Sequence, residues 1–305
     1  MSPEAPPVIA IFGPTGIGKT AVALELADLL REGGEDPVAI SADALQVYRG
    51  LETLTGAATV DERSRLEHRL TSFLEPSATF SVGEFMPLAH AEIDQARVAG
   101  RRPIVVGGTG LYLRAALTDL TLAPAPPPEL RERLRAELAA RGPDAMHQEL
   151  SRRAPAAAAA IEPTDRTRVV RSLELLELGV EPPAAGGSSE LWTDATRVPT
   201  RLFGLTMDRE RLYGLIDSRV DQIVAAGAAE EIRRAVAAGA SPTARSALGF
   251  DDLLAGDVDA MKRRTRQYAK RQLTWMRKLA GVTTIDVTDR NAGDAAARIL
   301  EETRA

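Results

Sequence analysis

The sequence predicts an α/β protein in which a parallel sheet is flanked by helices. Short apolar runs alternate along the chain with longer stretches of helical periodicity, and the first three runs are each followed by a loop rich in Gly, Ser, Thr or Asp. Such alternation is typical of parallel sheets that are covered on both faces. Because ligands of these sheets bind beyond the carboxyl ends of the strands, we expect the functional residues to lie in these loops.

The first part of the chain contains three predicted strands. They are apolar runs at residues 8–12, 37–41 and 103–106. Helical spacing of apolar residues predicts one helix at residues 20–31 and another at residues 82–99. The alternation of strand and helix is therefore established within the first third of the chain.

A proline-rich stretch at residues 124–128 interrupts this pattern and predicts a hinge or boundary. The residues that follow are rich in Arg, Glu, Leu and Ala and give no strand signal. We expect residues 1–123 to form the first part of an α/β core, residues 124–199 an all-helical insertion, and residues 200–305 the return to the core. Within the insertion, the Gly/Ser sequence at residues 186–189 predicts a flexible loop.

The returning part of the core is predicted to end as it began, with strands between helices. The expected strands cover residues 202–205 and 282–287. The expected helices cover residues 209–239, 258–279 and 292–303.

The composition indicates an ordinary water-soluble enzyme. The 305 residues are 44% hydrophobic and 27% charged, without an apolar run long enough to span a bilayer and without a signal-peptide pattern at the N-terminus. The absence of cysteine excludes disulfides and thiolate metal sites, and three scattered histidines disfavour a zinc site. We expect a cytoplasmic protein that does not bind membranes. A net charge of −5 does not exclude nucleic acid, because binding depends on where the positive charge lies.

The strongest motif follows the first strand and matches the P-loop pattern G-x-x-x-x-G-K-[ST]. The residues predicted to bind a diphosphate or triphosphate are Gly13, Pro14, Thr15, Gly16, Ile17, Gly18, Lys19 and Thr20. Glycines let consecutive backbone N–H groups converge on phosphate oxygens, and the positive end of the next helix adds to this field. Lys19 supplies a cation, and the Thr20 hydroxyl is the expected ligand of Mg²⁺. The alternative is a glycine-rich turn that opens a helix by chance, which the strand–loop–helix context disfavours.

A second acidic residue at a strand end, which P-loop hydrolases use to hold Mg²⁺, is not found where it is expected. The strand at residues 103–106 runs into glycines and Thr109 instead. Asp43, two residues after the strand that ends at Ser41, would face the same crevice. Its carboxylate is suited to bind Mg²⁺ through water or to accept a proton from a nucleophile. A helix N-cap is the alternative role.

A basic segment at residues 262–278 also contains Tyr268 and Trp275. On a helix both rings lie on one stripe with Arg271. A cationic face with aromatic rings is suited to contact a phosphate backbone and to stack unpaired bases of RNA. The alternative is a solvated helix whose aromatic rings pack inward.

Taken together, these residues identify a family. The sequence resembles the bacterial tRNA dimethylallyltransferases, also called tRNA isopentenyltransferases, over nearly its whole length. The matching segments are residues 13–20, 41–50, 106–112, 248–250 and 265–277, together with Asp165, Arg168, Arg171 and Glu174.

The resemblance implies transfer of a dimethylallyl group from dimethylallyl diphosphate to N6 of the adenosine immediately 3′ of the anticodon in tRNA. The P-loop would then hold a diphosphate, with Mg²⁺ as cofactor and without consumption of ATP. The resemblance implies catalytic roles for Asp43, Thr109 and Lys19, with Asp43 taking the proton of the amine. Arg209 and Arg219 are candidates for a further diphosphate contact. We expect a monomer.

The resemblance also implies an extended tRNA-binding surface, with the helical insertion closing on the anticodon stem-loop. The residues implied to contact tRNA are Asp43, Ala44, Leu45, Gln46, Thr109, Arg131, Thr167, Arg168, Arg171, Gly249, Phe250, Lys270, Arg271, Gln272, Trp275 and Arg277.

Four positions depart from the family pattern. Ala58 stands where a lysine is expected, Ala44 where a serine is common, Phe250 in place of a tyrosine, and Leu215 in place of an arginine.

Two other functions are compatible with the P-loop and the basic helix. One is an ATP-dependent kinase, and the other is an RNA-binding module without catalysis.

Overall fold

The computed structural model describes residues 5–184 and 190–304. The chain forms two compact units, one of Met1–Leu120 with Leu191–Ala305 and the other of Thr121–Glu190, whereas the insertion was expected at residues 124–199. The flexible loop predicted at residues 186–189 lies outside the described residues. Each unit is described by itself below.

The larger unit is built on a six-stranded parallel sheet with the order β3-β2-β4-β1-β5-β6, which confirms the predicted α/β fold class. The strands are β1 (Val8–Phe12), β2 (Pro37–Ser41), β3 (His68–Arg69), β4 (Arg102–Gly107), β5 (Thr200–Thr206) and β6 (Val282–Asp286). Every residue of β1 and β2 is buried, as expected for parallel strands with both faces covered. β1 pairs with β4 on one side and β5 on the other, so the loop after β1 lies in the middle of the sheet edge.

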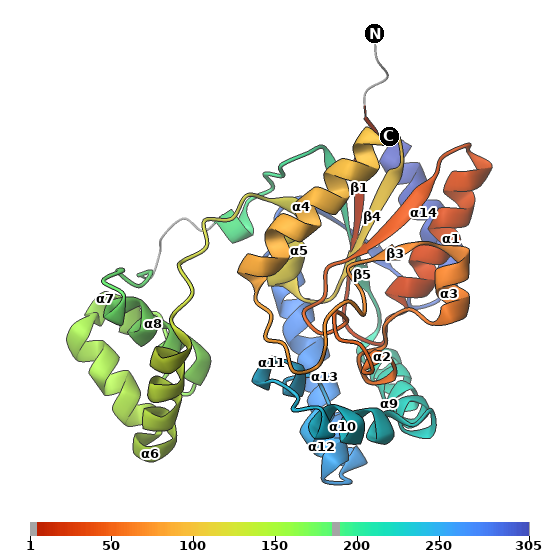
Figure 1. Ribbon diagram of the computed structural model, residues 1–305. Helices are drawn as coiled ribbons and strands as arrows, with labels where there is room; N and C mark the ends of the chain where they lie inside the picture. Colours follow the sequence, from red (N-terminus) through yellow and green to blue (C-terminus); the bar gives the residue numbers. More distant parts are fainter. Residues whose placement is uncertain (1–4, 185–189, 305) are drawn as a thin grey trace. The chain divides into compact units, whose positions relative to one another are not determined.

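Helices cover both faces of the sheet (Figure 1). α1 (Lys19–Glu32) and α14 (Ala292–Arg304) pack together on one face, and α4 (Val82–Val98) packs with α5 (Gly110–Leu117) on the other. The apolar residues of α1 and α14 join those of β1 in one fully buried cluster, including Leu26. Burial of each such side chain contributes about 1.5–3 kcal/mol, which fixes the sheet beneath the site.

The larger unit contains further helices besides those that cover the sheet. They are α2 (Glu52–Thr55), α3 (Val60–Arg65), the 3₁₀ turn η1 (Glu190–Trp192), α9 (Arg209–Ala225), α10 (Ala228–Ala237), α11 (Pro242–Arg245), α12 (Phe250–Leu254) and α13 (Val258–Met276). The single helix expected at residues 209–239 is two helices. Gly227 separates them because its φ of 90° is left-handed, a backbone conformation that a helix cannot contain.

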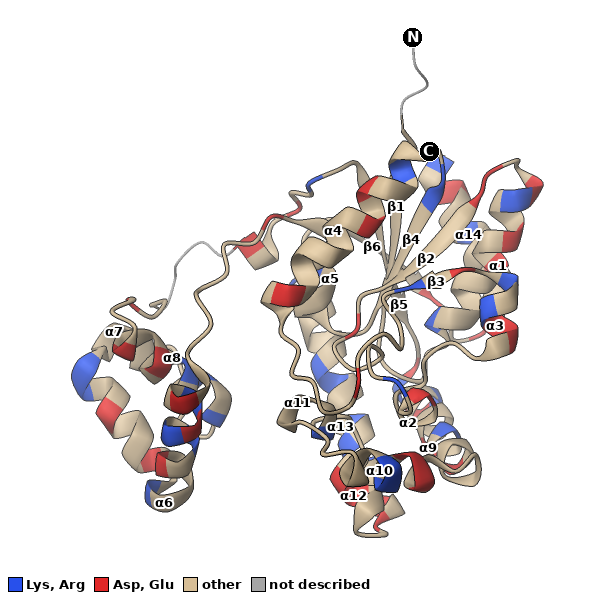
Figure 2. Ribbon diagram, viewed as in Figure 1, with Lys and Arg blue, Asp and Glu red and all other residues tan. Residues whose placement is uncertain are grey.

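The smaller unit is helical throughout. It consists of α6 (Pro128–Arg153), α7 (Pro155–Ala158) and α8 (Arg166–Glu177), and α6 is kinked at Gly142, where φ is 78°. Its own core contains Leu134, Met146 and Leu173. Acidic and basic residues alternate over α6 and α8 (Figure 2), and many form ion pairs within the unit.

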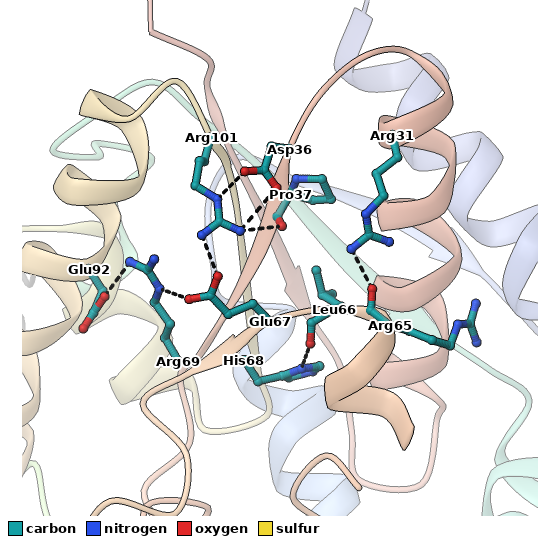
Figure 3. A network of polar contacts seen from close by, with 10 residues as sticks. All are labelled: Arg31, Asp36, Pro37, Arg65, Leu66, Glu67, His68, Arg69, Glu92 and Arg101. Atoms are coloured by element: carbon teal, nitrogen blue, oxygen red, sulfur yellow. Dashed lines mark hydrogen bonds and ion pairs between the residues drawn. The ribbon is translucent and has the colours of Figure 1, made fainter. Parts of the chain in front are cut away.

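The edge strand β3 is enclosed by a network of ion pairs (Figure 3). Arg101 bonds Asp36 and Glu67, and Arg69 bonds Glu67 and Glu92. A short, charged edge strand prevents pairing with a second chain. Among the described residues, no helix is long and apolar enough to cross a membrane.

Candidate active site

The P-loop connects the end of β1 to the start of α1. Gly16 and Gly18 have φ of 83° and 92°, in the left-handed region that favours glycine. The Lys19 ammonium folds back and donates to the carbonyls of Gly13 (2.9 Å) and Pro14 (3.0 Å). The local geometry is therefore that of a phosphate-binding loop with its lysine in place.

A cavity of about 800 Å³ opens beside this loop. Its lining includes Ser41 and Gly107, which end β2 and β4, so the cavity lies beyond the carboxyl ends of the strands, as predicted. The side chains of Lys19, Asp43 and Arg219 all face it. The sheet thus brings residues from distant parts of the chain to one place.

Two cations in the cavity are destabilised by their surroundings. Burial, with the nearby Arg219 guanidinium, lowers the pKa of Lys19 to about 8, and Asp43 partly opposes this shift. Burial likewise lowers the pKa of Arg219, against the charges of Glu62 and Asp43. A polyanion that enters the cavity would relieve this mutual repulsion.

Gly56 makes room for Arg219. Gly56 follows α2 with φ of 61°, and a Cβ at this position would overlap the Arg219 guanidinium. Of the two arginines considered for a diphosphate contact, Arg219 lines the cavity, whereas Arg209 is exposed and lies over the Tyr213 ring.

Asp43 lies in a turn between β2 and α2. Its carboxylate accepts a hydrogen bond from the Leu45 N–H (2.9 Å), and because no helix starts there, it is not a helix N-cap. Gln46 fixes the far side of the turn, since its side chain bonds the Ser41 hydroxyl (2.9 Å) and the Gly56 carbonyl (3.1 Å). Ala44 and Leu45 are partly buried in the same turn.

Thr109 follows β4 and meets α13. Its hydroxyl lies 3.1 Å from the Tyr268 hydroxyl. Burial and the nearby Asp43 raise the pKa of Tyr268 to about 12, so the phenol keeps its proton. Tyr268 was expected only as a ring on the basic helix, and the structure makes it a partner of Thr109.

Two residues that the resemblance implies contact tRNA have buried side chains in this structure. Gln272 is 5% exposed, and both ends of its amide bond the backbone of other loops. Phe250 is fully buried, so its ring has no surface on which a base can stack. Gly249 precedes it with φ of 89°, packed against Met261.

The basic helix α13 is divided along its length. In its first part Lys262, Arg264 and Arg266 pair with Asp221, Asp252 and Asp217. Within residues 5–184 and 190–304, the later cations Lys270, Arg271 and Arg277 have no ion-pair partner. We call the exposed residues Lys270, Arg271, Thr274 and Arg277 the outer face of α13.

Trp275 packs inward rather than onto the outer face. Its ring lies 4.6 Å from that of Trp192, centroid to centroid, and Lys278 lies over Trp192. Gly110 lies beneath the Trp275 ring, where a Cβ would overlap it. The indole therefore braces the start of α5, next to Thr109.

In the smaller unit, Arg131 and Arg171 converge on the buried carboxylate of Glu174. Arg171 also donates to the backbone of the proline-rich stretch. Thr167 and Arg168 are exposed at the start of α8, which Asp165 caps. Two of the four expected tRNA contacts in this unit thus also hold the unit together.

The departures from the family pattern have different surroundings. Ala58 lines the cavity and adds no charge there, whereas Leu215 is exposed on α9. Arg219, which also lines the cavity, comes from α9, the helix that carries Leu215.

Glu231 was missed by sequence reasoning. This buried carboxylate on α10 accepts hydrogen bonds from the Thr53 and Leu54 N–H groups, each at 3.0 Å, and so fixes the turn that leads to Gly56. One glutamate among the acids of an amphipathic helix carries no local signal of such a partner. No group of three or more His, Asp or Glu side chains that could hold a metal ion exists among the described residues.

Comparison with known proteins gives consistent matches. A family described as IPP transferase matches residues 46–279, and one described as isopentenyl transferase matches residues 6–77. The tRNA dimethylallyltransferase of Thermomicrobium roseum is 40% identical over 92% of this chain and 87% of its own length. That of Geobacillus kaustophilus is 39% identical over 97% of this chain and 95% of its own length.

Solved structures agree with these sequences. A tRNA isopentenylpyrophosphate transferase from Bacillus halodurans is 35% identical, with a TM-score of 0.68 over 98% of both chains. A eukaryotic dimethylallyltransferase acting on tRNA has a TM-score of 0.73 at 25% identity, over 93% of this chain and 74% of its own. The fold, the P-loop and the extent of these matches lead to one conclusion: the chain belongs to the IPP transferase family.

Proposed function

We propose that this protein transfers a dimethylallyl group from dimethylallyl diphosphate to N6 of the adenosine immediately 3′ of the anticodon in tRNA. The products are N6-dimethylallyladenosine and diphosphate. The observation that carries the proposal is the single cavity in which a P-loop lysine, a second buried cation and the Asp43 carboxylate meet. The relatives that are named tRNA dimethylallyltransferase support the same reaction.

The P-loop side of the cavity binds the leaving group. The allylic C–O bond breaks, and its electron pair leaves with the diphosphate. Lys19, Arg219 and the loop amides stabilise this growing negative charge, which is the largest contribution expected from such a site. The low pKa of Lys19 in the free protein fits a cation that is prepared for an anion.

The opposite side of the cavity handles the acceptor. As N6 forms its bond to the allylic carbon, the amine becomes positively charged and must lose one proton. Asp43 takes that proton, while Thr109, whose hydroxyl contacts that of Tyr268, orients the adenine. The adenine has to leave the anticodon-loop stack to reach this point.

Magnesium fits the donor side of the site. The Thr20 hydroxyl lines the cavity at the P-loop and is an oxygen ligand of the kind that Mg²⁺ prefers together with diphosphate oxygens. The bound ion would neutralise charge on the diphosphate.

The proposed RNA contacts are the outer face of α13 in the larger unit and, described separately, the exposed Thr167 and Arg168 of the smaller unit. The unpaired cations Lys270, Arg271 and Arg277 are free to contact phosphates, unlike the paired cations earlier in the helix. We propose that the protein acts as a monomer.

One assay tests this function. The protein is incubated with unmodified tRNA, labelled dimethylallyl diphosphate and Mg²⁺, without ATP. We expect label in the tRNA at the adenosine 3′ of the anticodon. No incorporation, together with turnover of ATP, would favour a kinase instead, and tRNA binding without either reaction would favour a binding module.

A further inference from the structure

Gln272 connects two loops of the donor cavity from within α13. Its Oε1 accepts a hydrogen bond from the Thr15 N–H of the P-loop at 2.8 Å. Its Nε2 donates to the Gly108 carbonyl, at the end of β4, at 2.7 Å. The side chain is buried, so water cannot replace either bond without a rearrangement.

The space around this amide is fully used. A Cβ on Gly108 would lie 2.5 Å from the Gln272 Nε2 and 3.3 Å from the Lys19 ammonium. The Gln272 amide is therefore packed closely against Gly108, and a shift of Gln272 would strain or break its bonds to Gly108 and Thr15. Gly108 and the P-loop residue Thr15 both lie beside Lys19, the cation that we propose holds the leaving diphosphate.

The neighbours of Gln272 in sequence lie on the outer face of the same helix. Lys270 and Arg271 are exposed and have no ion-pair partner among the described residues. One turn earlier, Tyr268 contacts Thr109, the residue next to Gly108. A helix moves as a rigid element, so a ligand that fixes its outer face also fixes its inner face.

We propose that Gln272 is a positioning residue that couples RNA binding on the outer face of α13 to diphosphate binding in the P-loop. The inference rests on the proposed function, because it takes tRNA and dimethylallyl diphosphate as the two ligands. RNA that fixes α13 holds Gln272 against Thr15 and Gly108 and thereby raises the affinity for the donor. By linkage the donor raises the affinity for RNA by the same factor.

The test uses the full chain and three variants. Gln272→Met removes both hydrogen bonds at nearly constant volume, and Gln272→Glu keeps the acceptor for Thr15 but turns an oxygen toward the Gly108 carbonyl. Gln267→Met is the matched control, because Gln267 is an exposed glutamine on the same helix. Circular dichroism and thermal unfolding establish that each variant is folded.

Calorimetry measures the dissociation constant of dimethylallyl diphosphate with and without an anticodon stem-loop RNA. In this RNA, purine riboside replaces the target adenosine, so the reacting N6 amine is missing and no turnover occurs. For the wild type and Gln267→Met, we expect RNA to tighten donor binding by a factor in the range of about 5- to 150-fold that is usual for coupled sites. In folded Gln272→Met and Gln272→Glu we expect the factor to fall close to one, with a higher donor KM.

Three results would overturn the inference: no coupling in the wild type, unchanged coupling in a folded Gln272 variant, or equal loss in Gln267→Met. If Gln272→Met does not fold, Gln272→Glu decides. A wild type that binds both ligands but transfers nothing to natural tRNA would instead refute the proposed function. The two failures are therefore distinguishable.

Discussion

In the donor cavity, Lys19 and Arg219 are held against carbonyl groups and glycines, whereas on the outer face of α13 Lys270, Arg271 and Arg277 extend into solvent. The first group is electrostatically strained before any ligand arrives, as the lowered pKa values of its members indicate. The second group is exposed and has no ion-pair partner among the described residues, although Arg271 lies over the Tyr268 ring. A small anion in a buried site is bound by few fixed contacts, while a long polyanion is bound by many weak ones. Single substitutions should therefore have large effects in the cavity and small effects on the outer face of α13.

The largest effect is expected for Asp43→Asn. Asparagine keeps the oxygen that accepts from the Leu45 N–H, so the turn is preserved while the base is removed. We expect the single-turnover transfer rate to fall by roughly 10²–10⁴-fold, with tRNA affinity little changed. An equal loss of tRNA binding would make Asp43 a recognition residue rather than a base.

The next largest effect is expected for Gly56→Ala, because the new Cβ would displace the Arg219 guanidinium from the cavity. We expect the donor KM to rise by roughly 10–100-fold, because a misplacement of about 1 Å in a positioned group can cost up to about 10²-fold. Gly50→Ala is the matched control: its φ of 71° gives similar backbone strain, but nothing lies within 4 Å of a Cβ there. Similar kinetics for the two variants would show that the rise in KM does not depend on displacement of Arg219.

Much of the fold and of the donor cavity could be predicted from the sequence, but the buried face of α13 could not. The apolar run of β1 lies between Pro7 and Gly13 and that of β2 begins at Pro37, and both strands were predicted to the residue. β3 was missed because two polar residues produce no strand pattern. The P-loop motif and Asp43 follow from local spacing. The family resemblance implied that Gln272 contacts tRNA, and nothing in the local sequence indicates that this polar side chain on a basic helix is buried. Its partners, Thr15 and Gly108, lie 257 and 164 positions away.

A smaller effect is expected from pH. The pKa of Lys19 is about 8 in the free protein, below the ordinary 10.5, so the ammonium loses its proton as pH rises through 8. Diphosphate favours the charged form, and donor binding should take up a proton above that pH. We expect the donor affinity to fall by up to about tenfold from pH 7.5 to pH 9. Calorimetry in buffers of different ionisation enthalpy measures this uptake, which Lys19→Arg should abolish. Affinity that rises with pH would contradict the assignment.

The smallest effect is expected on the outer face of α13. Alanine at both Lys270 and Arg271 should lower the slope of log affinity against log salt for tRNA by roughly 1.4–1.8, the value for two lost phosphate contacts. Alanine at both Arg263 and Arg264 is the control, because these cations pair with Asp257 and Asp252 within the protein. Filter binding at several salt concentrations gives the slopes. Equal slopes for the two double variants would show that the unpaired cations contact no more RNA phosphates than the ion-paired ones.

The contact between Trp192 and Trp275 has a practical consequence. The chain contains two tryptophans, and their rings lie 4.6 Å apart. All the tryptophan emission of the protein therefore originates from this one pair of packed indoles. Trp275 braces Gly110 beside Thr109, and Trp192 lies where the chain re-enters the larger unit after Glu190. The protein therefore contains an optical reporter, without any attached dye, between the loop that carries Thr109 and the segment at Trp192.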